Sequence, residues 1–233
     1  MAGAEWRVRE GRSVARFSDR LVVQGRRVGL LDLSVCLLAG DRVPSGSLNL
    51  LRPLFAASVS EGIRRDTGII SWLNWPDLVT IDNRVVARTS LSLASHQEPG
   101  RVAKIVARIL VDCFASRSIG FSLASLPSTS ILKSLGVEID VDLLRDKVLH
   151  ALNWYRAEWE RGMCKKLVER ISPTIVWLGR DVEVRLADGS ALRGRATSLD
   201  DHGSLLLRLK PEGKRSTTLT IRPETVDFVH SLS

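Results

Sequence analysis

Hydrophobic positions along the chain follow two periods, one typical of strands and one typical of helices. Alternating or short unbroken apolar runs predict strands at 21–24, 29–38, 69–73, 78–82, 84–94 and 102–114. Apolar residues at helical spacing predict helices from Leu48 to near Gly68, from near Asp140 to Gly162, and over 164–171. We therefore expect an α+β fold, with a mixed or antiparallel central sheet flanked by helices.

The pattern changes at Pro173. From there the chain contains five short alternating segments, separated by the turn sequences "LGRD", "ADGS", "DDHGS" and "PEGK". Short strands with turns at this density predict a small antiparallel β-barrel. The sequence thus predicts two domains, a core at 1–171 and a C-terminal barrel at 172–233.

Composition narrows the class of protein. No apolar run reaches the roughly 18–20 residues that span a bilayer, and the charged start "MAGAEWRVREGR" has no apolar stretch typical of a secretion signal. The three cysteines, Cys36, Cys113 and Cys164, are far apart and odd in number, which favours reduced thiols in the cytoplasm. The four histidines lack metal-ligand spacing, so no metal site is predicted.

A net charge of +8 favours acidic partners, with compositional bias as the alternative because acids are interspersed among the arginines. In the barrel, Arg180, Arg193 and Arg195 are predicted to face a groove between the two domains, or else to lie on a solvated strand face. Its only aromatic residues, Trp177 and Phe228, stand in apolar settings. Nucleic-acid binding, which uses exposed aromatic side chains, is therefore the third choice of function.

The stretch "NWPDLVTIDNRVVAR", residues 74–88, follows a predicted helix and strand. In this order it resembles the Lys-Trp-Pro-Asn-Asp motif of the biotin protein ligase family, with the turn and Ala-Gly strand that follow it. "STSILKSLGVEIDVDLLRDKVLHALNWYRAEWERG" resembles the family's Thr-Ser-Leu loop and long helix, and the sequence from Thr174 resembles its SH3-like barrel. The resemblance covers roughly residues 30 to 230 and depends on the order of the elements.

The resemblance implies a biotin/lipoate ligase-like core plus a C-terminal SH3-like barrel. Family members activate biotin with ATP to biotinyl-5′-AMP and then acylate one lysine of a carrier protein. Biotin and ATP are thus implied as ligands by resemblance only, and lipoate or no ligand stays open. Trp75 and Pro76 match the motif and are the first candidate binding residues. In "EGRSVARF", Gly11, Arg12 and Arg16 resemble a remnant of the family's Gly-Arg-Gly-Arg loop, with a charged N-terminal arm as the alternative.

The chain departs from the family at several positions that the chemistry requires. The family's lysine is Asn74 here, so no catalytic residue is assigned. An amide becomes the acid Asp77, Leu78 follows, and Arg88 stands where the family has a glycine. A biotin carboxylate attacking a phosphate needs cations and bare backbone, so these changes predict impaired or absent ligase activity. The later glycine-rich strand is matched by "VARILVD", residues 106–112, which is interpreted as an ordinary core strand.

The N-terminal region also departs from the family. Residues 1–10 do not resemble the family's first strand and helix, and no winged helix-turn-helix precedes the core. A core without that strand would leave a sheet edge open to another chain, which predicts a homodimer or hetero-complex.

Three hypotheses follow from these observations. The first is a divergent biotin–[carboxyl carrier protein] ligase with impaired activity, and the second is a pseudoenzyme that serves as a non-catalytic binding or regulatory partner. Its expected partners are a biotin carboxyl carrier protein or carboxylase, or a complete ligase subunit. Nucleic-acid binding is the third.

Overall fold

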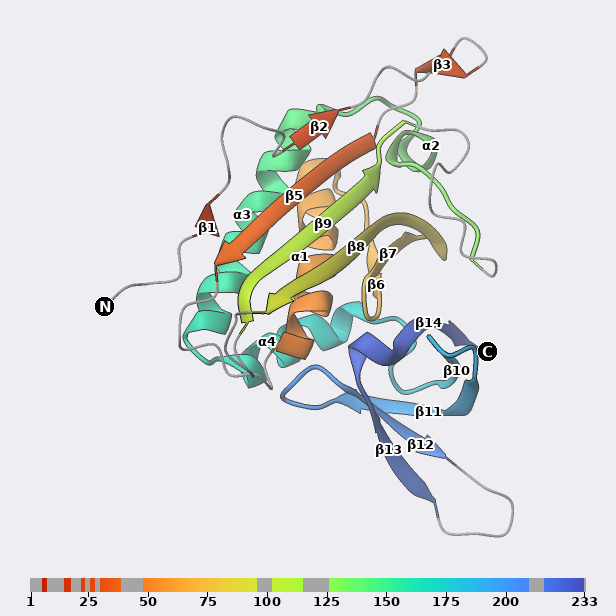
Figure 1. Cartoon of the computed structure of the whole chain (residues 1–233). Helices are drawn as coiled ribbons and strands as arrows, with labels where there is room; N and C mark the ends of the chain where they lie inside the picture. Colours follow the sequence, from red (N-terminus) through yellow and green to blue (C-terminus); the bar gives the residue numbers. More distant parts are fainter. Residues whose placement is uncertain are drawn as a thin grey trace.

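The computed structural model describes the backbone of residues 6–7, 15–17, 22–23, 26–27, 30–38, 48–95, 102–114, 126–209 and 216–232. Two larger antiparallel sheets, one short strand pair and several helices make up the described chain, which confirms the α+β fold (Figure 1). The large sheet has the strand order β1-β5-β9-β8-β7-β6, with β2 also paired to β5. Its strands are β1 (Trp6–Arg7), β2 (Ala15–Phe17), β5 (Leu30–Leu38), β6 (Trp72–Asn74), β7 (Leu78–Ile81), β8 (Arg84–Ser95) and β9 (Val102–Asp112). A separate pair consists of β3 (Val22–Val23) and β4 (Arg26–Arg27), where a turn was expected at the second strand.

One face of the large sheet forms the core. In β5, Leu31, Leu33 and Val35 are buried while the residues between them are more exposed, as the period of two along a strand requires. The helices α1 (Leu48–Thr67) and α3 (Val141–Glu160) cover this face together (Figure 1). No helix of the described residues packs on the opposite face, because α1 and α3 both lie on the same side.

Two shorter helices complete the core: α2 (Ile131–Leu135) and α4 (Cys164–Ile171). The two longer helices, α1 and α3, lie where the sequence predicts them. Asp140 caps α3 by accepting from the backbone N–H groups of Asp142 and Leu143. Gly62 lets α1 and α3 approach closely, because a Cβ at this position would lie 2.9 Å from the backbone of Val148.

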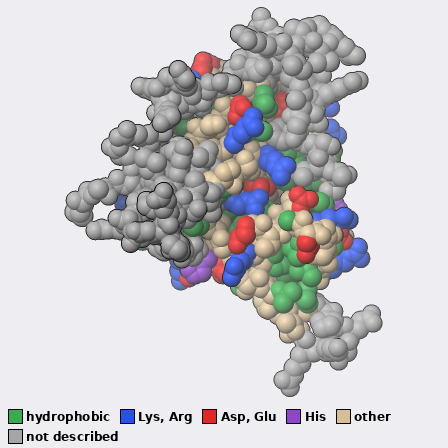
Figure 2. All heavy atoms as spheres, in the orientation of Figure 1, with side chains coloured by type: hydrophobic (Ala, Val, Ile, Leu, Met, Phe, Trp, Pro, Cys, Tyr) green, Lys and Arg blue, Asp and Glu red, His purple; other side chains and the backbone are tan. Residues whose placement is uncertain are grey.

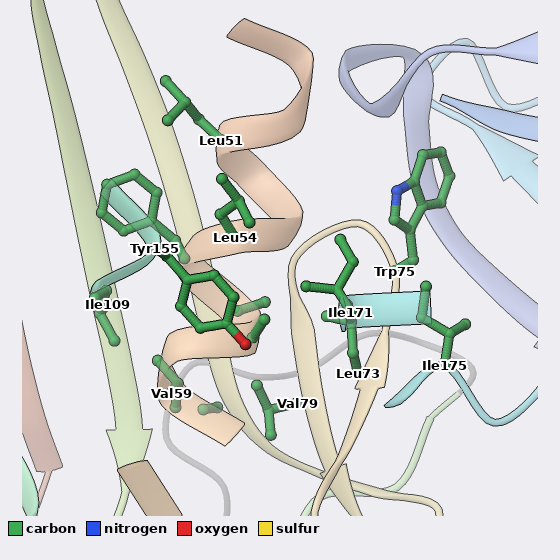
Figure 3. Packing of buried hydrophobic residues seen from close by; sticks show 14 of the residues in the cluster. Leu51, Leu54, Val59, Leu73, Trp75, Val79, Ile109, Tyr155, Ile171 and Ile175 are labelled. Carbon is green, nitrogen blue, oxygen red and sulfur yellow. The ribbon is translucent and has the colours of Figure 1, made fainter. Parts of the chain in front are cut away.

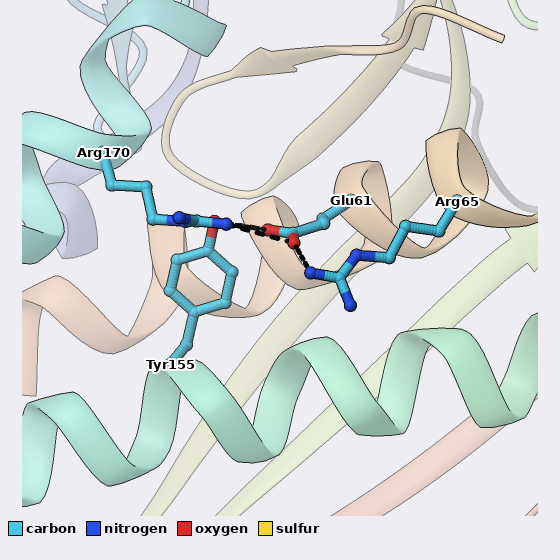
Figure 4. A network of polar contacts seen from close by, with 4 residues as sticks. All are labelled: Glu61, Arg65, Tyr155 and Arg170. Atoms are coloured by element: carbon cyan, nitrogen blue, oxygen red, sulfur yellow. Dashed lines mark hydrogen bonds and ion pairs between the residues drawn. The ribbon is translucent and has the colours of Figure 1, made fainter. Parts of the chain in front are cut away.

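A polar network joins three helices inside this packing (Figure 4). The carboxylate of Glu61 in α1 is 8% exposed and accepts from Arg170 in α4 at 3.2 Å and from the Tyr155 hydroxyl of α3 at 3.1 Å. Arg65, one turn further along α1, also donates to it. Burial raises the pKa of Glu61, but the two guanidiniums and the tyrosine outweigh burial and lower this pKa below its ordinary value of 4.5.

The small sheet has the strand order β13-β12-β11-β10-β14. Its strands are β10 (Asp181–Leu186), β11 (Ala191–Leu199), β12 (Leu205–Leu209), β13 (Thr217–Ile221) and β14 (Val226–Ser231). A 3₁₀ turn, η2 (Ser172–Thr174), leads into it, and a second, η3 (Pro223–Thr225), precedes its last strand. These five short strands agree with the predicted SH3-like architecture.

A single hydrophobic cluster runs through both sheets. It includes Leu31 and Ile109 of the large sheet, Ile171 and Trp177 of the connection, and Val184 of the small sheet. The predicted division at residue 171 stays a prediction, because the described packing is continuous across it.

The outer edge of β5 differs from the sequence-based expectation. β1 pairs with it at Cys36 and Leu37, and β2 pairs with it from Leu31 to Leu33. The open edge that motivated a dimer is therefore occupied along much of its length by the chain itself. Among the described residues, no helix is long and apolar enough to cross a membrane.

The Glu61 network yields a stability prediction. Glu61→Gln removes the charge that two guanidiniums share and is expected to lower the free energy of unfolding by about 1–3 kcal/mol at neutral pH. Because the folded-state pKa of Glu61 is lowered, its contribution is complete above pH 4.5 and is lost as the pH falls through the folded-state pKa.

The difference between wild type and variant should therefore shrink below pH 4.5, as measured by urea unfolding at several pH values. Glu169→Gln, at an exposed position of α4, is the matched control and should change little. A difference that stays constant with pH would contradict the assignment.

Candidate functional site

The Trp-Pro turn between β6 and β7 packs against the small sheet. Trp75 is fully buried, and its indole Nε1–H donates to the carbonyl oxygen of Gly203 at 3.1 Å. Figure 3 shows this ring beyond the β6–β7 turn, on the side of the small sheet. Gly203 has φ +82°, and a Cβ there would lie 3.0 Å from the backbone of Leu50, so only glycine fits this approach. The peptide bond between Trp75 and Pro76 is cis.

Asn74 is also engaged with the C-terminal part of the chain. Its side chain is only 9% exposed, and its Oδ1 accepts from the indole Nε1–H of Trp177 at 3.2 Å. The rings of Trp75 and Trp177 meet edge to face, with centroids 6.5 Å apart. The residue at the family's lysine position thus holds a buried tryptophan.

Asp77, the last residue of the turn, makes a further contact toward the C-terminal part of the chain through Arg52. It is 2% exposed, and one carboxylate oxygen accepts from Arg52 of α1, which also donates to the carbonyl oxygen of Pro223. Burial raises the pKa of Asp77, while Arg52 and then Arg88 oppose this rise. The charge of Asp77 therefore serves to fix Arg52 between α1 and the small sheet.

The helix-free face of the large sheet carries a row of side chains set by strand register. Successive cross-strand pairs join Asn74 to Leu78, Leu78 to Arg88, Arg88 to Leu110, and Leu110 to Asp32. Arg88 is half-buried and lies between two leucines of a small apolar cluster that is separate from the core. Arg88 therefore stands in the middle of this row.

The neighbouring row contains an ion pair. Arg108 stands between Ser34 and Ser90, and its guanidinium binds the carboxylate of Asp32 through two nitrogens, at 3.0 and 2.7 Å. Figure 2 shows basic and acidic side chains gathered on this side of the molecule. In the strand around Arg108, interpreted as an ordinary core strand, Ala107, Ile109 and Val111 are buried in the core, while Arg108 is exposed on the other face.

The structure brings only part of the predicted site together. Trp75 and Pro76 lie at the turn beside Asn74, where Trp75 has no exposed surface. Gly11 and Arg12 lie outside the described residues, and only the backbone of Arg16 is described, opposite Asp32 in the β2–β5 pair. Ligand binding by these five residues stays a prediction. Within the described side chains, no group of three or more His, Cys, Asp or Glu is arranged to hold a metal ion.

Comparison with solved structures identifies the fold. The chain superimposes on the biotin protein ligase from Aquifex aeolicus with a TM-score of 0.70 and 22% identity, covering 93% of this chain and 87% of that one. The same enzyme in complex with biotin and ATP gives a TM-score of 0.67 and 21% identity, with 86% and 78% covered.

A biotin protein ligase-like protein of unknown function from Silicibacter sp. TM1040 gives 0.65 and 15% identity, with 84% and 79% covered. No protein-family model and no curated protein matches the chain. These similarities show that the chain has the biotin protein ligase fold, which confirms the fold expected from the sequence.

Sequence reasoning missed the partners of the motif residues. Trp177 is 103 positions from Asn74, and Gly203 is 128 positions from Trp75. Contacts at such sequence separations leave no local pattern. The only signal for them is chemical, because a buried Trp requires an acceptor for its indole N–H.

The Asn74–Trp177 hydrogen bond can be tested by its loss. Asn74→Ala would leave a buried indole N–H without an acceptor, so we expect the free energy of unfolding to fall by about 1–3 kcal/mol. Asn153→Ala, at an exposed position of α3, is the control and should have little effect. Chemical denaturation monitored by tryptophan fluorescence measures both; equal stability of the two variants would contradict a structural role for Asn74.

Proposed function

We propose that this chain is a divergent biotin protein ligase-like protein in which ligase activity is impaired or absent. The observation that carries the proposal is the hydrogen bond between Asn74 and Trp177. The family resemblance assigns this position to a lysine. An amide held by a buried indole supplies no positive charge to a carboxylate and a phosphate.

Arg88 supports the same conclusion from a second position. The resemblance assigns a glycine here, so that an adenylate can lie against the strand. In this chain, a long charged side chain projects from the middle of the row between Leu78 and Leu110. These residues do not fit biotinyl-5′-AMP in the way that the resemblance implies, and no reaction step is assigned to them.

A binding role remains compatible with this geometry. The ion pair between Asp32 and Arg108 and the half-buried Arg88 give the helix-free face a polar surface that is set by strand register. We therefore propose as the second function a non-catalytic partner of a biotin carboxyl carrier protein or of a complete ligase. A homodimer is tested separately, by light scattering at micromolar concentration.

A labelling assay tests the proposed loss of activity. The protein is incubated with ATP, biotin and a biotin carboxyl carrier domain, and biotinylated lysine is measured by mass spectrometry beside a working biotin protein ligase. Loss of a transition-state donor costs about 10²–10³ in rate, so we expect labelling to be slower by at least about that factor. Labelling at the rate of the working enzyme would refute the proposal.

Calorimetry with a non-hydrolysable biotinyl-adenylate separates binding from catalysis. We expect no heat with the wild type and measurable heat with Arg88→Gly, because removal of the guanidinium clears the strand. Arg84→Gly, at the exposed start of β8, controls for a glycine in this strand and should behave as the wild type. Binding by the wild type would show that Arg88 does not block the face.

A further inference from the structure

The outer face of the small sheet carries a set of charges that the site described above does not use. Alternation along the strands buries Val182 and Val184 of β10, Ala196 of β11, and Leu207 of β12. The intervening side chains point outward and include six charged residues, which we call the outer arginine face: Asp181, Glu183, Arg185, Arg193, Arg195 and Arg208. Four of these are basic and two are acidic.

In one half of this face, the acidic side chain forms ion pairs with both neighbouring arginines. Glu183 accepts from Arg193 at 2.8 Å and lies 3.4 Å from the guanidinium of Arg185. These contacts lower the pKa of Glu183, chiefly through the hydrogen bond from Arg193. The contacts of Glu183 with Arg193 and Arg185 show that guanidinium groups on this face can bind a carboxylate.

The other half also has one acid and two arginines, but its described side chains form no such ion pairs. Strand register sets Arg195 directly opposite Arg208, with Asp181 on the far side of Arg195 and Thr218 on the far side of Arg208. Both arginines are exposed, and neither has an ion-pair partner among the side chains that the structure describes. Like charges directly opposite in an antiparallel pair destabilise a sheet. The fold gains no packing from this arrangement, because both side chains lie outside the core.

We propose that the outer arginine face binds an acidic polypeptide segment, with Arg195 and Arg208 together as the principal contact. A carboxylate placed between the two guanidiniums would relieve their repulsion and repeat the arrangement that Glu183 already makes with Arg193 and Arg185. Arginine suits this role because its planar fork of donors matches a carboxylate in two-point contact.

One observation favours a polypeptide over a nucleic acid. Stacking on bases requires exposed rings, whereas Phe228 is 7% exposed and has the guanidinium of Arg185 over its ring at 5.8 Å. The inference does not depend on biotin binding, since none of these residues belongs to the Trp-Pro turn or to the large sheet.

A binding experiment tests this surface in the full-length protein. A fluorescently labelled oligoglutamate peptide is titrated with wild type and with Arg195→Glu/Arg208→Glu, and its anisotropy is measured at low and high salt. We expect the double variant to bind about tenfold or more weakly, and the wild-type affinity to fall as salt rises. Arg84→Glu makes the same kind of charge change on the large sheet and should keep wild-type affinity.

A second readout separates the proposal from general damage to the fold. Arg208→Glu alone replaces a repulsive cross-strand pair by an attractive one, so it should raise the melting temperature while it weakens peptide binding. Unchanged affinity in this variant, or an equal loss in Arg84→Glu, would overturn the proposal. Tighter binding of a DNA strand of matched charge, dependent on the same two arginines, would overturn it in favour of a nucleic acid.

Discussion

The packing of the small sheet against the large sheet depends on the hydrogen bonds that one buried turn makes. The turn from Asn74 to Asp77 connects two strands of the large sheet, yet its side chains bond to residues that come much later in the chain or lie in α1. A buried donor or acceptor without a partner costs about as much as several apolar contacts supply. Separating the turn from the small sheet would therefore leave the indole N–H groups of Trp75 and Trp177 without their acceptors.

This constraint is the physical basis of the proposed loss of ligase activity. The resemblance implies that, in the family, the same segment serves a reaction that needs a cation and bare backbone. Here Asn74 accepts a hydrogen bond from Trp177, and Trp75 donates one to Gly203. Arg88 lies in the strand paired with the one that follows the turn. The neutral amide of Asn74, whose oxygen accepts from Trp177, supplies no positive charge to a developing anion.

The sequence predicted the elements well and the long-range contacts poorly. Period and turn signals located the helices from Leu48 and from Asp140, and the five short strands after Pro173, because these signals are local. The order of motifs indicated the fold, which structural comparison confirms. Local pattern could not reveal that β1 and β2 cover the edge of β5, since pairings of two or three residues leave no periodicity. Nor could it reveal that Trp177 donates a hydrogen bond to Asn74, because this contact forms only when the two sheets pack together.

The continuous hydrophobic cluster has a consequence for how the molecule can be divided. Ile175 and Trp177 belong to the segment that leads into the small sheet, but they are buried in the same cluster as the residues of the large sheet. Cutting the chain at the connection would expose both of these side chains to water on one fragment and leave a matching apolar hollow on the other. The small sheet and the large sheet therefore share one buried cluster, and the segment 175–177 links them within it.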